Sequence, residues 1–268
     1  MKKFLLGVAA GVVMAGLFGV VAVLVAARMG SVETSVDRNS TLVLRLEGTI
    51  GEKAGADMPF AFLGGAAPPT VVDVWKALKK AAIDPKIKAV VLMPRGLGLG
   101  WAKLEEIRAG LVEYKASGKP LFVYLRAPRT PEYYLATAAD RIHMVPEDLL
   151  DMKGLRAEIT YFKGAMDKLG VRLESEHAGK YKDALDTFTR TGMTAESREA
   201  LDLLLDGLWN QLTETIAKAR KKDPAGVKKL LDEGPFLADQ AKAAGLVDEL
   251  LFEDQFFERV KEAAGGEL

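Results

Sequence analysis

The sequence predicts an α/β fold with a mainly parallel β-sheet and a helical C-terminal portion. Three observations lead to this prediction. From residue 71 onward, β-type runs alternate with helical segments, a pattern typical of right-handed βαβ crossovers. The run IKAVVLM, residues 87–93, is apolar and short enough for a buried strand. From about residue 194 to residue 222, helical spacing takes over. The 268 residues suffice for one large domain or two small ones.

The elements of the first half follow in order from hydrophobic spacing. Alternation at period two in TLVLRLEGTI predicts a strand near residues 42–46, and residues 56–70, rich in Gly, Ala and Pro, read as a loop. Helices are then expected at residues 71–82, 101–117 and 131–140, with strands at residues 87–93, 120–125 and 141–145.

The second half begins with a helix expected at residues 159–170 and a strand at residues 171–177. The long helical region carries a predicted apolar face made of leucines: Leu201, Leu204, Leu205, Leu208 and Leu212. Two shorter helices and a closing segment, GLVDELL, complete the chain. We find no internal repeat.

The first residues predict an uncleaved membrane anchor. Lys2 and Lys3 precede an uncharged apolar run, residues 4–27, which is long enough for a helix to span the ~30 Å hydrocarbon core of a bilayer. A cleavable signal peptide has a shorter apolar core of about 7–15 residues. We therefore divide the chain into a transmembrane anchor (1–29), a polar stalk (30–40) and a folded domain (41–268). The two lysines favour a cytoplasmic N-terminus, which places the domain outside the cytoplasm.

Composition argues against several classes of function. Lysine plus arginine equals aspartate plus glutamate at 37 each, so no charge bias favours nucleic acid. There is no cysteine, which excludes disulfides and thiolate chemistry. The two histidines, His143 and His177, leave little for a transition-metal cluster. We expect no metal and no cofactor, and acid–base chemistry has to come from Lys, Tyr or carboxylates.

The stretch HAGKYKDALDTFTRTGM contains a candidate general base. A lysine acts as a base only when burial or a nearby cation lowers its pKa from about 10.4. Lys182 follows Gly179 and Tyr181 at a predicted strand-to-helix turn, where a site can be built. Lys180 lies earlier in the turn and is expected to face water. By residue chemistry alone, a solvated surface charge is the commoner role for either lysine.

Two further loops carry candidate chemistry, each with a simpler alternative. The run PRGLGLGW follows a buried strand and opens a helix, so its backbone N–H groups could bind an oxyanion or a phosphate. It matches neither a Walker A loop nor GxGxxG, and a tight turn explains it as well. In RAPRTPEYYLATAAD, Thr130 is either a nucleophile or, with Pro131 next, the N-cap of a helix.

Together these loops resemble the signal peptide peptidase A family of membrane-anchored bacterial serine peptidases. GKYKDALDTFTRTGMTAESREAL looks like the family's lysine loop, in which Lys182 matches the general base. Tyr133 and Tyr134 look like the tyrosine pair after the family's nucleophile turn, and Gly98 matches the first glycine of its oxyanion loop. The resemblance extends from about Leu42 to Leu251. It implies a Clp-protease/crotonase-like fold of repeated ββα units.

The sequence departs from this family at the nucleophile. Thr130 stands in the position of the family serine, and Pro131 and Glu132 replace two glycines. Proline removes a backbone donor and fixes φ, while glutamate adds bulk and charge. Leu97 and Leu99 stand where the oxyanion loop of the family has proline and glycine. The resemblance therefore implies a chain that has the lysine but not the serine.

Long members of the family contain two copies of the fold, the first supplying the lysine and the second the serine. The resemblance thus implies the lysine-donating half of a membrane-bound Ser–Lys endopeptidase, anchored in the bacterial inner membrane, that degrades remnant signal peptides. Lys182 would be the base, Thr130 an inactive nucleophile position, and Gly98 and Leu99 the oxyanion and substrate-binding residues. The expected partners are peptide substrates, the membrane, a serine-bearing half or chain, and further copies in an oligomer.

Two other functions stay open from the sequence. A catalytically inactive, membrane-anchored scaffold or binding relative would explain Thr130, Pro131 and Glu132. An acyl-CoA enzyme of the crotonase type would share the fold, although an outward-facing domain does not meet cytoplasmic coenzyme A.

Overall fold

A computed structural model describes residues 2–29, 36–52 and 69–265 of the chain. It divides into two units, residues 1–37 and 38–268. The first unit contains helix α1 (Lys2–Met29), so the N-terminal run is helical as expected. The transmembrane part of that prediction is not supported, because no helix within the described residues is long and apolar enough to cross a membrane. The predicted stalk and the loop at residues 56–70 lie largely outside the described residues.

The second unit is built on a parallel sheet of five strands in the order β1-β2-β3-β4-β7. The mainly parallel sheet predicted from the sequence is therefore confirmed. Six consecutive residues of β2, from Ala89 to Pro94, are buried, as expected for a strand covered on both faces. Ile87 is buried as well, and only Lys88 between them is exposed. The strands are β1 (Ser40–Glu47), β2 (Ile87–Arg95), β3 (Leu121–Leu125), β4 (Arg141–Met144) and β7 (Glu249–Leu250).

Three helices belong to the crossovers of this sheet: α2 (Val71–Ile83), α3 (Trp101–Lys115) and α4 (Thr130–Ala136). The side chain of Thr70 accepts the Asp73 N–H and Asp73 accepts the Thr70 N–H, a capping box that begins α2. Helices α2 and α3 approach closely at Gly110, where a Cβ atom would lie 2.9 Å from Nε1 of Trp75. A glycine is needed at this crossing.

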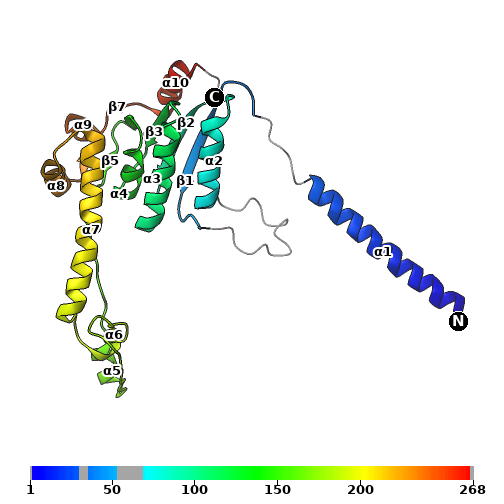
Figure 1. Ribbon diagram of the computed structural model, residues 1–268, viewed down its shortest axis with the longest axis horizontal. Helices are drawn as coiled ribbons and strands as arrows, with labels where there is room; N and C mark the ends of the chain where they lie inside the picture. Colours follow the sequence, from blue (N-terminus) through cyan, green and yellow to red (C-terminus); the bar gives the residue numbers. More distant parts are fainter. Residues whose placement is uncertain (1, 30–35, 53–68, 266–268) are drawn as a thin grey trace. The chain divides into compact units, whose positions relative to one another are not determined.

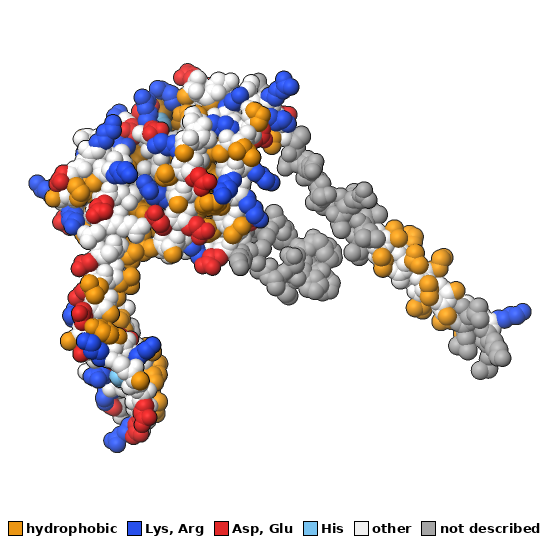
Figure 2. Space-filling view, in the orientation of Figure 1, with side chains coloured by type: hydrophobic (Ala, Val, Ile, Leu, Met, Phe, Trp, Pro, Cys, Tyr) orange, Lys and Arg blue, Asp and Glu red, His pale blue; other side chains and the backbone are white. Residues whose placement is uncertain are grey.

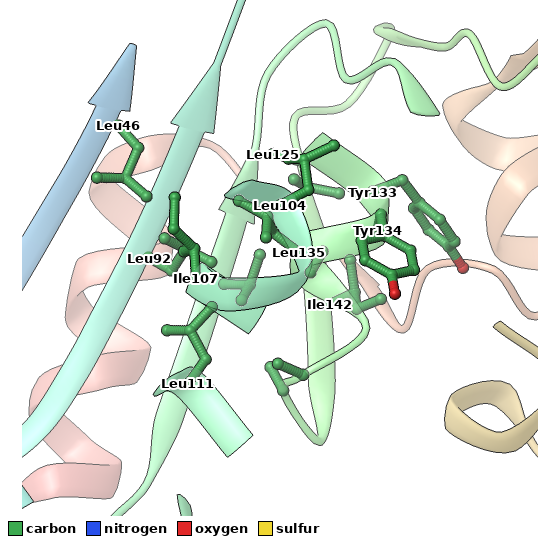
Figure 3. Packing of buried hydrophobic residues seen from close by; sticks show 14 of the residues in the cluster. Leu46, Leu92, Leu104, Ile107, Leu111, Leu125, Tyr133, Tyr134, Leu135 and Ile142 are labelled. Atoms are coloured by element: carbon green, nitrogen blue, oxygen red, sulfur yellow. The ribbon is translucent and has the colours of Figure 1, made fainter. Parts of the chain in front are cut away.

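The main core lies between these helices and one face of the sheet. Figure 3 shows Leu92 of β2 with Ile107 and Leu111 of α3, and the two tyrosines of α4 beside them. A second cluster uses alternate residues of β2, Val91 and Met93, and therefore covers the opposite face. The helix on that face is α10 (Glu253–Ala264), which the sequence analysis did not foresee. Phe256 of α10 stacks on Tyr124 of β3 with ring centroids 4.8 Å apart.

The C-terminal portion is mostly helical, as predicted. It comprises α7 (Ala195–Arg220), α8 (Pro224–Glu233), α9 (Ala238–Ala243) and a two-stranded antiparallel sheet of β5 (Leu149–Leu150) and β6 (Phe236–Leu237). The predicted leucine face of α7 is only partly correct. Leu212 is fully buried, whereas Leu204 is 57% exposed, because the first half of this long helix extends beyond the core.

Residues 153–204, called the arm here, connect β5 to the first turns of α7 and project from the sheet in Figure 1. The arm contains α5 (Lys163–Lys168) and α6 (Asp186–Thr189). The helix predicted at residues 159–170 is therefore shorter than expected. The strand predicted at residues 171–177 is wrong, because this segment has no sheet pairing within the described residues, and a strand needs a neighbour for its backbone hydrogen bonds.

A hydrogen-bonded ion pair joins the end of α7 to the sheet. The Arg220 guanidinium donates to both carboxylate oxygens of Asp248 at 2.8 Å, and its Nε donates to the Gly245 carbonyl at 2.9 Å. Asp248 also accepts the Ile142 N–H at 2.7 Å. The Arg220 side chain is only 8% exposed, so this pair lies largely out of water.

Removing the guanidinium should destabilise the fold strongly. Arg220→Ala leaves Asp248 partly buried without its partner, and we expect the free energy of unfolding to fall by about 3 kcal/mol. Arg141→Ala is the matched control, because its pair with Glu249 is at the surface and should contribute under about 1 kcal/mol. Urea denaturation of both variants measures the difference; equal losses would contradict the expectation.

The same pair should make stability depend on acid pH. Burial alone would raise the pKa of Asp248, but the hydrogen bonds from Arg220 and the Ile142 N–H outweigh it and hold the pKa below its usual value. A lowered pKa stabilises the fold above the unfolded-state pKa of about 3.9, and this contribution is lost as the pH falls below it. The gap in unfolding free energy between the wild type and Asp248→Asn should therefore narrow from pH 6 to pH 3 in urea titrations. A constant gap would contradict this assignment.

Candidate functional site

The loops at the carboxyl ends of β2 and β3 lie next to each other because these strands pair in parallel. The glycine-rich loop, residues 96–100, follows β2 and leads into α3. The turn at residues 126–129 follows β3 and leads into α4. Two of the three sequence-predicted loops therefore meet at one edge of the sheet.

Thr130 is not the N-cap residue that one of the two sequence interpretations made it. It is the first residue of α4, and Arg129 is the N-cap, so the expected N-cap role of Thr130 is wrong by one residue. The Thr130 hydroxyl accepts the Lys153 N–H at 3.0 Å and donates to the Lys153 carbonyl at 3.2 Å. These two contacts tie the nucleophile position to the start of the arm.

The candidate oxyanion residues lie in the glycine-rich loop. The Gly98 N–H donates to the Gly48 carbonyl at 2.9 Å, so in this conformation it is not free to bind an oxyanion. Leu99 is half-buried and packs against the main core. The residue before them, Leu97, donates its N–H to the Glu132 carboxylate at 2.5 Å.

Glu132 is the residue whose role the sequence analysis missed. Its side chain is fully buried, and it accepts the N–H of Arg129 at 2.9 Å as well as that of Leu97. The Arg129 guanidinium lies 3.5 Å from the same carboxylate and donates to the Leu97 carbonyl at 3.1 Å. A glutamate three residues after a helix N-cap is a capping signal, which could have suggested the local contact with Arg129.

The tyrosine pair after Thr130 is part of the core rather than of an open site. Both rings are fully buried. The Tyr133 hydroxyl donates to the Leu246 carbonyl at 2.7 Å, and the Tyr134 hydroxyl donates to the Glu105 carboxylate. Burial raises the pKa of both phenols, which keeps them protonated. These two hydrogen bonds hold α4 against α3 and against the segment between α9 and β7.

Lys182 lies on the arm, between α5 and α6, and is exposed. The turn before it requires Gly179, whose φ is +100°, and the Lys182 N–H donates to the Gly179 carbonyl at 3.3 Å. Figure 1 shows α5 and α6 at the end of α7 that points away from the sheet, whereas Thr130 begins α4 at the sheet. Within this chain, the predicted base and the predicted nucleophile position are therefore not brought together.

Lys180 differs from Lys182 in its surroundings. Its ammonium lies 4.9 Å from the centre of the Tyr181 ring, and the hydroxyl of Tyr181 donates to Glu199 at 3.0 Å. The interaction with Tyr181 raises the pKa of Lys180, and nearby Glu199 acts in the same direction. A raised pKa keeps this lysine charged, which is the opposite of what a general base needs.

The histidines have no position in a shared site. His143 is buried in the second core cluster, where its Nδ1 contacts the Val123 carbonyl at 3.1 Å and burial lowers its pKa. His177 is exposed on the arm. Across residues 2–29, 36–52 and 69–265, no group of three or more His, Cys, Asp or Glu residues is arranged to hold a metal ion.

The chain is 29% identical over 232 residues to the chloroplastic serine protease SPPA of Arabidopsis thaliana, covering 87% of this chain and 33% of the relative. It is 30% identical over 204 residues to Protease 4 of Haemophilus influenzae, covering 72% of this chain and 33% of the relative. The chain thus spans about a third of the length of these relatives.

Likeness to solved structures is weaker. A peptidase from Plasmodium falciparum superposes with a TM-score of 0.46 at 11% identity, over 79% of this chain and 95% of that one. An enoyl-CoA hydratase/isomerase family member gives a TM-score of 0.43 at 15% identity, over 73% of this chain and 65% of that one. Neither superposition is close enough to support an argument about function.

The sequence model of peptidase family S49 matches residues 113–266, which include the turn of Thr130, the tyrosine pair and the whole arm. This match covers more than half of the chain, and the two relatives above are named serine protease SPPA and Protease 4. The resemblance to signal peptide peptidase A seen in the sequence motifs is thereby confirmed, and the chain belongs to peptidase family S49.

Proposed function

We propose that the chain is the lysine-donating part of a Ser–Lys endopeptidase that degrades remnant signal peptides. Lys182 is the general base, and the serine belongs to a second half or a partner chain with the same Clp-protease/crotonase-like fold. One observation carries the proposal: the lysine matching the family base lies on an exposed arm, away from the chain's own nucleophile position. The location of the domain outside the cytoplasm stays a prediction from Lys2 and Lys3.

The surface of the arm supports a partner that covers it. Large apolar side chains are exposed along the arm, as they are at surfaces that bind another protein, and Figure 2 shows several along the projecting part. They are Ile159, Phe162, Leu169, Val171, Leu173, Tyr181, Leu185, Phe188, Leu203 and Leu204. A serine-bearing half, or a further copy in an oligomer, would bury this surface and Lys182 with it.

Burial by a partner would also give Lys182 its chemistry. Only the neutral amine accepts a proton, and removal from water favours the neutral form of a lysine. The neutral Lys182 then takes the proton of the partner's serine as the serine oxygen attacks the scissile carbonyl. Backbone N–H groups stabilise the resulting oxyanion, and the acyl-enzyme is hydrolysed by water with the same lysine as base.

Replacing Lys182 tests the base directly. In the assembly with the serine-bearing partner, Lys182→Ala should lower peptide cleavage by about 10²–10⁴-fold, the usual contribution of a general base. Lys182→Arg should be as inactive, because a guanidinium keeps its proton. Lys180→Ala, two residues away, is the matched control and should cleave at the wild-type rate. Cleavage that survives Lys182→Ala would refute the assignment and favour a non-catalytic binding subunit.

A charge on the arm should weaken assembly without unfolding the chain. Leu204 is 57% exposed, so Leu204→Glu should change the unfolding free energy of the chain alone by under about 0.5 kcal/mol. Because a buried leucine contributes about 1.5–3 kcal/mol, the same variant should bind the serine-bearing partner about tenfold more weakly or worse. Sedimentation velocity over a range of concentrations measures this.

The control for this variant is Ile83→Glu. Ile83 is an apolar residue of α2 outside the arm and is 84% exposed. It should leave the affinity for the partner unchanged. Equal weakening by both variants would show that the arm is not the surface that the partner covers.

A further inference from the structure

Glu132 joins two segments that are far apart in sequence. Each carboxylate oxygen accepts a different backbone N–H: Oε2 accepts that of Arg129 at 2.9 Å, and Oε1 accepts that of Leu97 at 2.5 Å. The side chain has no exposed surface. An ionised carboxylate is tolerated in such a place only when hydrogen bonds and a cation compensate it, and the Arg129 guanidinium at 3.5 Å supplies the cation.

A helix cap explains only one of these contacts. In a capping box the side chain of the fourth residue returns to the N-cap N–H, which accounts for the bond between Oε2 and Arg129. The bond to Leu97 crosses 35 residues of chain and ends in the glycine-rich loop that precedes α3. That loop therefore already binds an anionic oxygen, which is supplied by the chain itself.

The position of that oxygen has a chemical meaning. Backbone N–H groups that start a glycine-rich loop beside a nucleophile are the donors that stabilise the oxyanion of acyl transfer. Here the Leu97 N–H is donated to Glu132 and the Gly98 N–H to the Gly48 carbonyl. The Thr130 hydroxyl, at the start of the same helix as Glu132, bonds the backbone of Lys153 in both directions.

We infer that the Glu132 carboxylate occupies the position of a reacting carbonyl oxygen and so closes this domain's own acyl-transfer site. The site then has the chemistry to bind a small carboxylate or oxyanion, and the Glu132 side chain of the same chain fills it permanently. For this reason Thr130 has no working oxyanion hole. In addition, its hydroxyl is held by its own hydrogen bonds to the backbone of Lys153. The inference does not depend on the role of Lys182.

The test is rescue of a truncated side chain by a small carboxylate. Glu132→Ala should leave the Leu97 N–H and the Arg129 guanidinium facing a space of the size of a carboxylate. We expect the melting temperature of the intact chain to fall by about 5–10 °C. Sodium formate at 100 mM should restore at least half of that loss, measured by differential scanning calorimetry against equal sodium chloride.

Three controls separate a specific site from a general salt effect. Formamide, a neutral molecule of similar shape, should restore nothing. Wild type and Glu132→Gln, whose sites are filled, should gain no more from formate than from chloride. Equal gains in all three proteins, or no gain for Glu132→Ala, would overturn the inference.

If Glu132→Ala is unfolded in chloride, the readout becomes its far-UV circular dichroism as formate is added. Recovery of the helical signal with formate and not with formamide supports the inference, and no recovery with formate overturns it. Because these measurements use the chain alone and no peptide substrate, a failure here leaves the lysine-donating function to be judged by the cleavage assay of Lys182→Ala.

Discussion

The parallel pairing of β2 with β1 on one side and β3 on the other is the constraint on which the rest of the structure depends. Seven of the nine residues of β2 are buried, so its alternate side chains have to be covered on both faces, by α2 and α3 on one and by α10 on the other. Parallel pairing also brings all carboxyl ends to one edge. The glycine-rich loop and the turn before Thr130 meet there because of strand pairing, although residues 101–125, which include all of α3 and β3, lie between them along the chain.

At that edge, a buried carboxylate takes the place that a substrate would need. Glu132 accepts a backbone N–H from each of the two loops. The Arg129 guanidinium compensates its charge and donates a hydrogen bond to the Leu97 carbonyl. Burying a carboxylate costs free energy unless its hydrogen bonds are all made, so any movement of the two loops that breaks one of these bonds is unfavourable. The network therefore makes the two loops more rigid. The same contacts that stabilise the edge of the sheet are incompatible with acyl transfer at Thr130.

The arm shows the reverse situation. Its apolar side chains are exposed, its segments have few partners in the described part of the chain, and the lysine that matches the family base lies on it. The sheet edge is closed by the chain's own groups, whereas the arm exposes Lys182 and a set of apolar side chains.

Local patterns in the sequence determined most elements of the first half and the long C-terminal helix, because hydrophobic period is a property of neighbouring residues. A local pattern also indicates the contact of Glu132 with Arg129, because a glutamate three residues after a helix N-cap is a capping signal. Only the tertiary structure decided that Glu132 also binds Leu97, that α10 covers the second face of the sheet, and that Leu204 is exposed. Residues 171–177 form no strand, because no described strand lies beside them to pair with. Periodicity reports which side of an element is apolar, but what covers that side depends on segments that are far away in sequence.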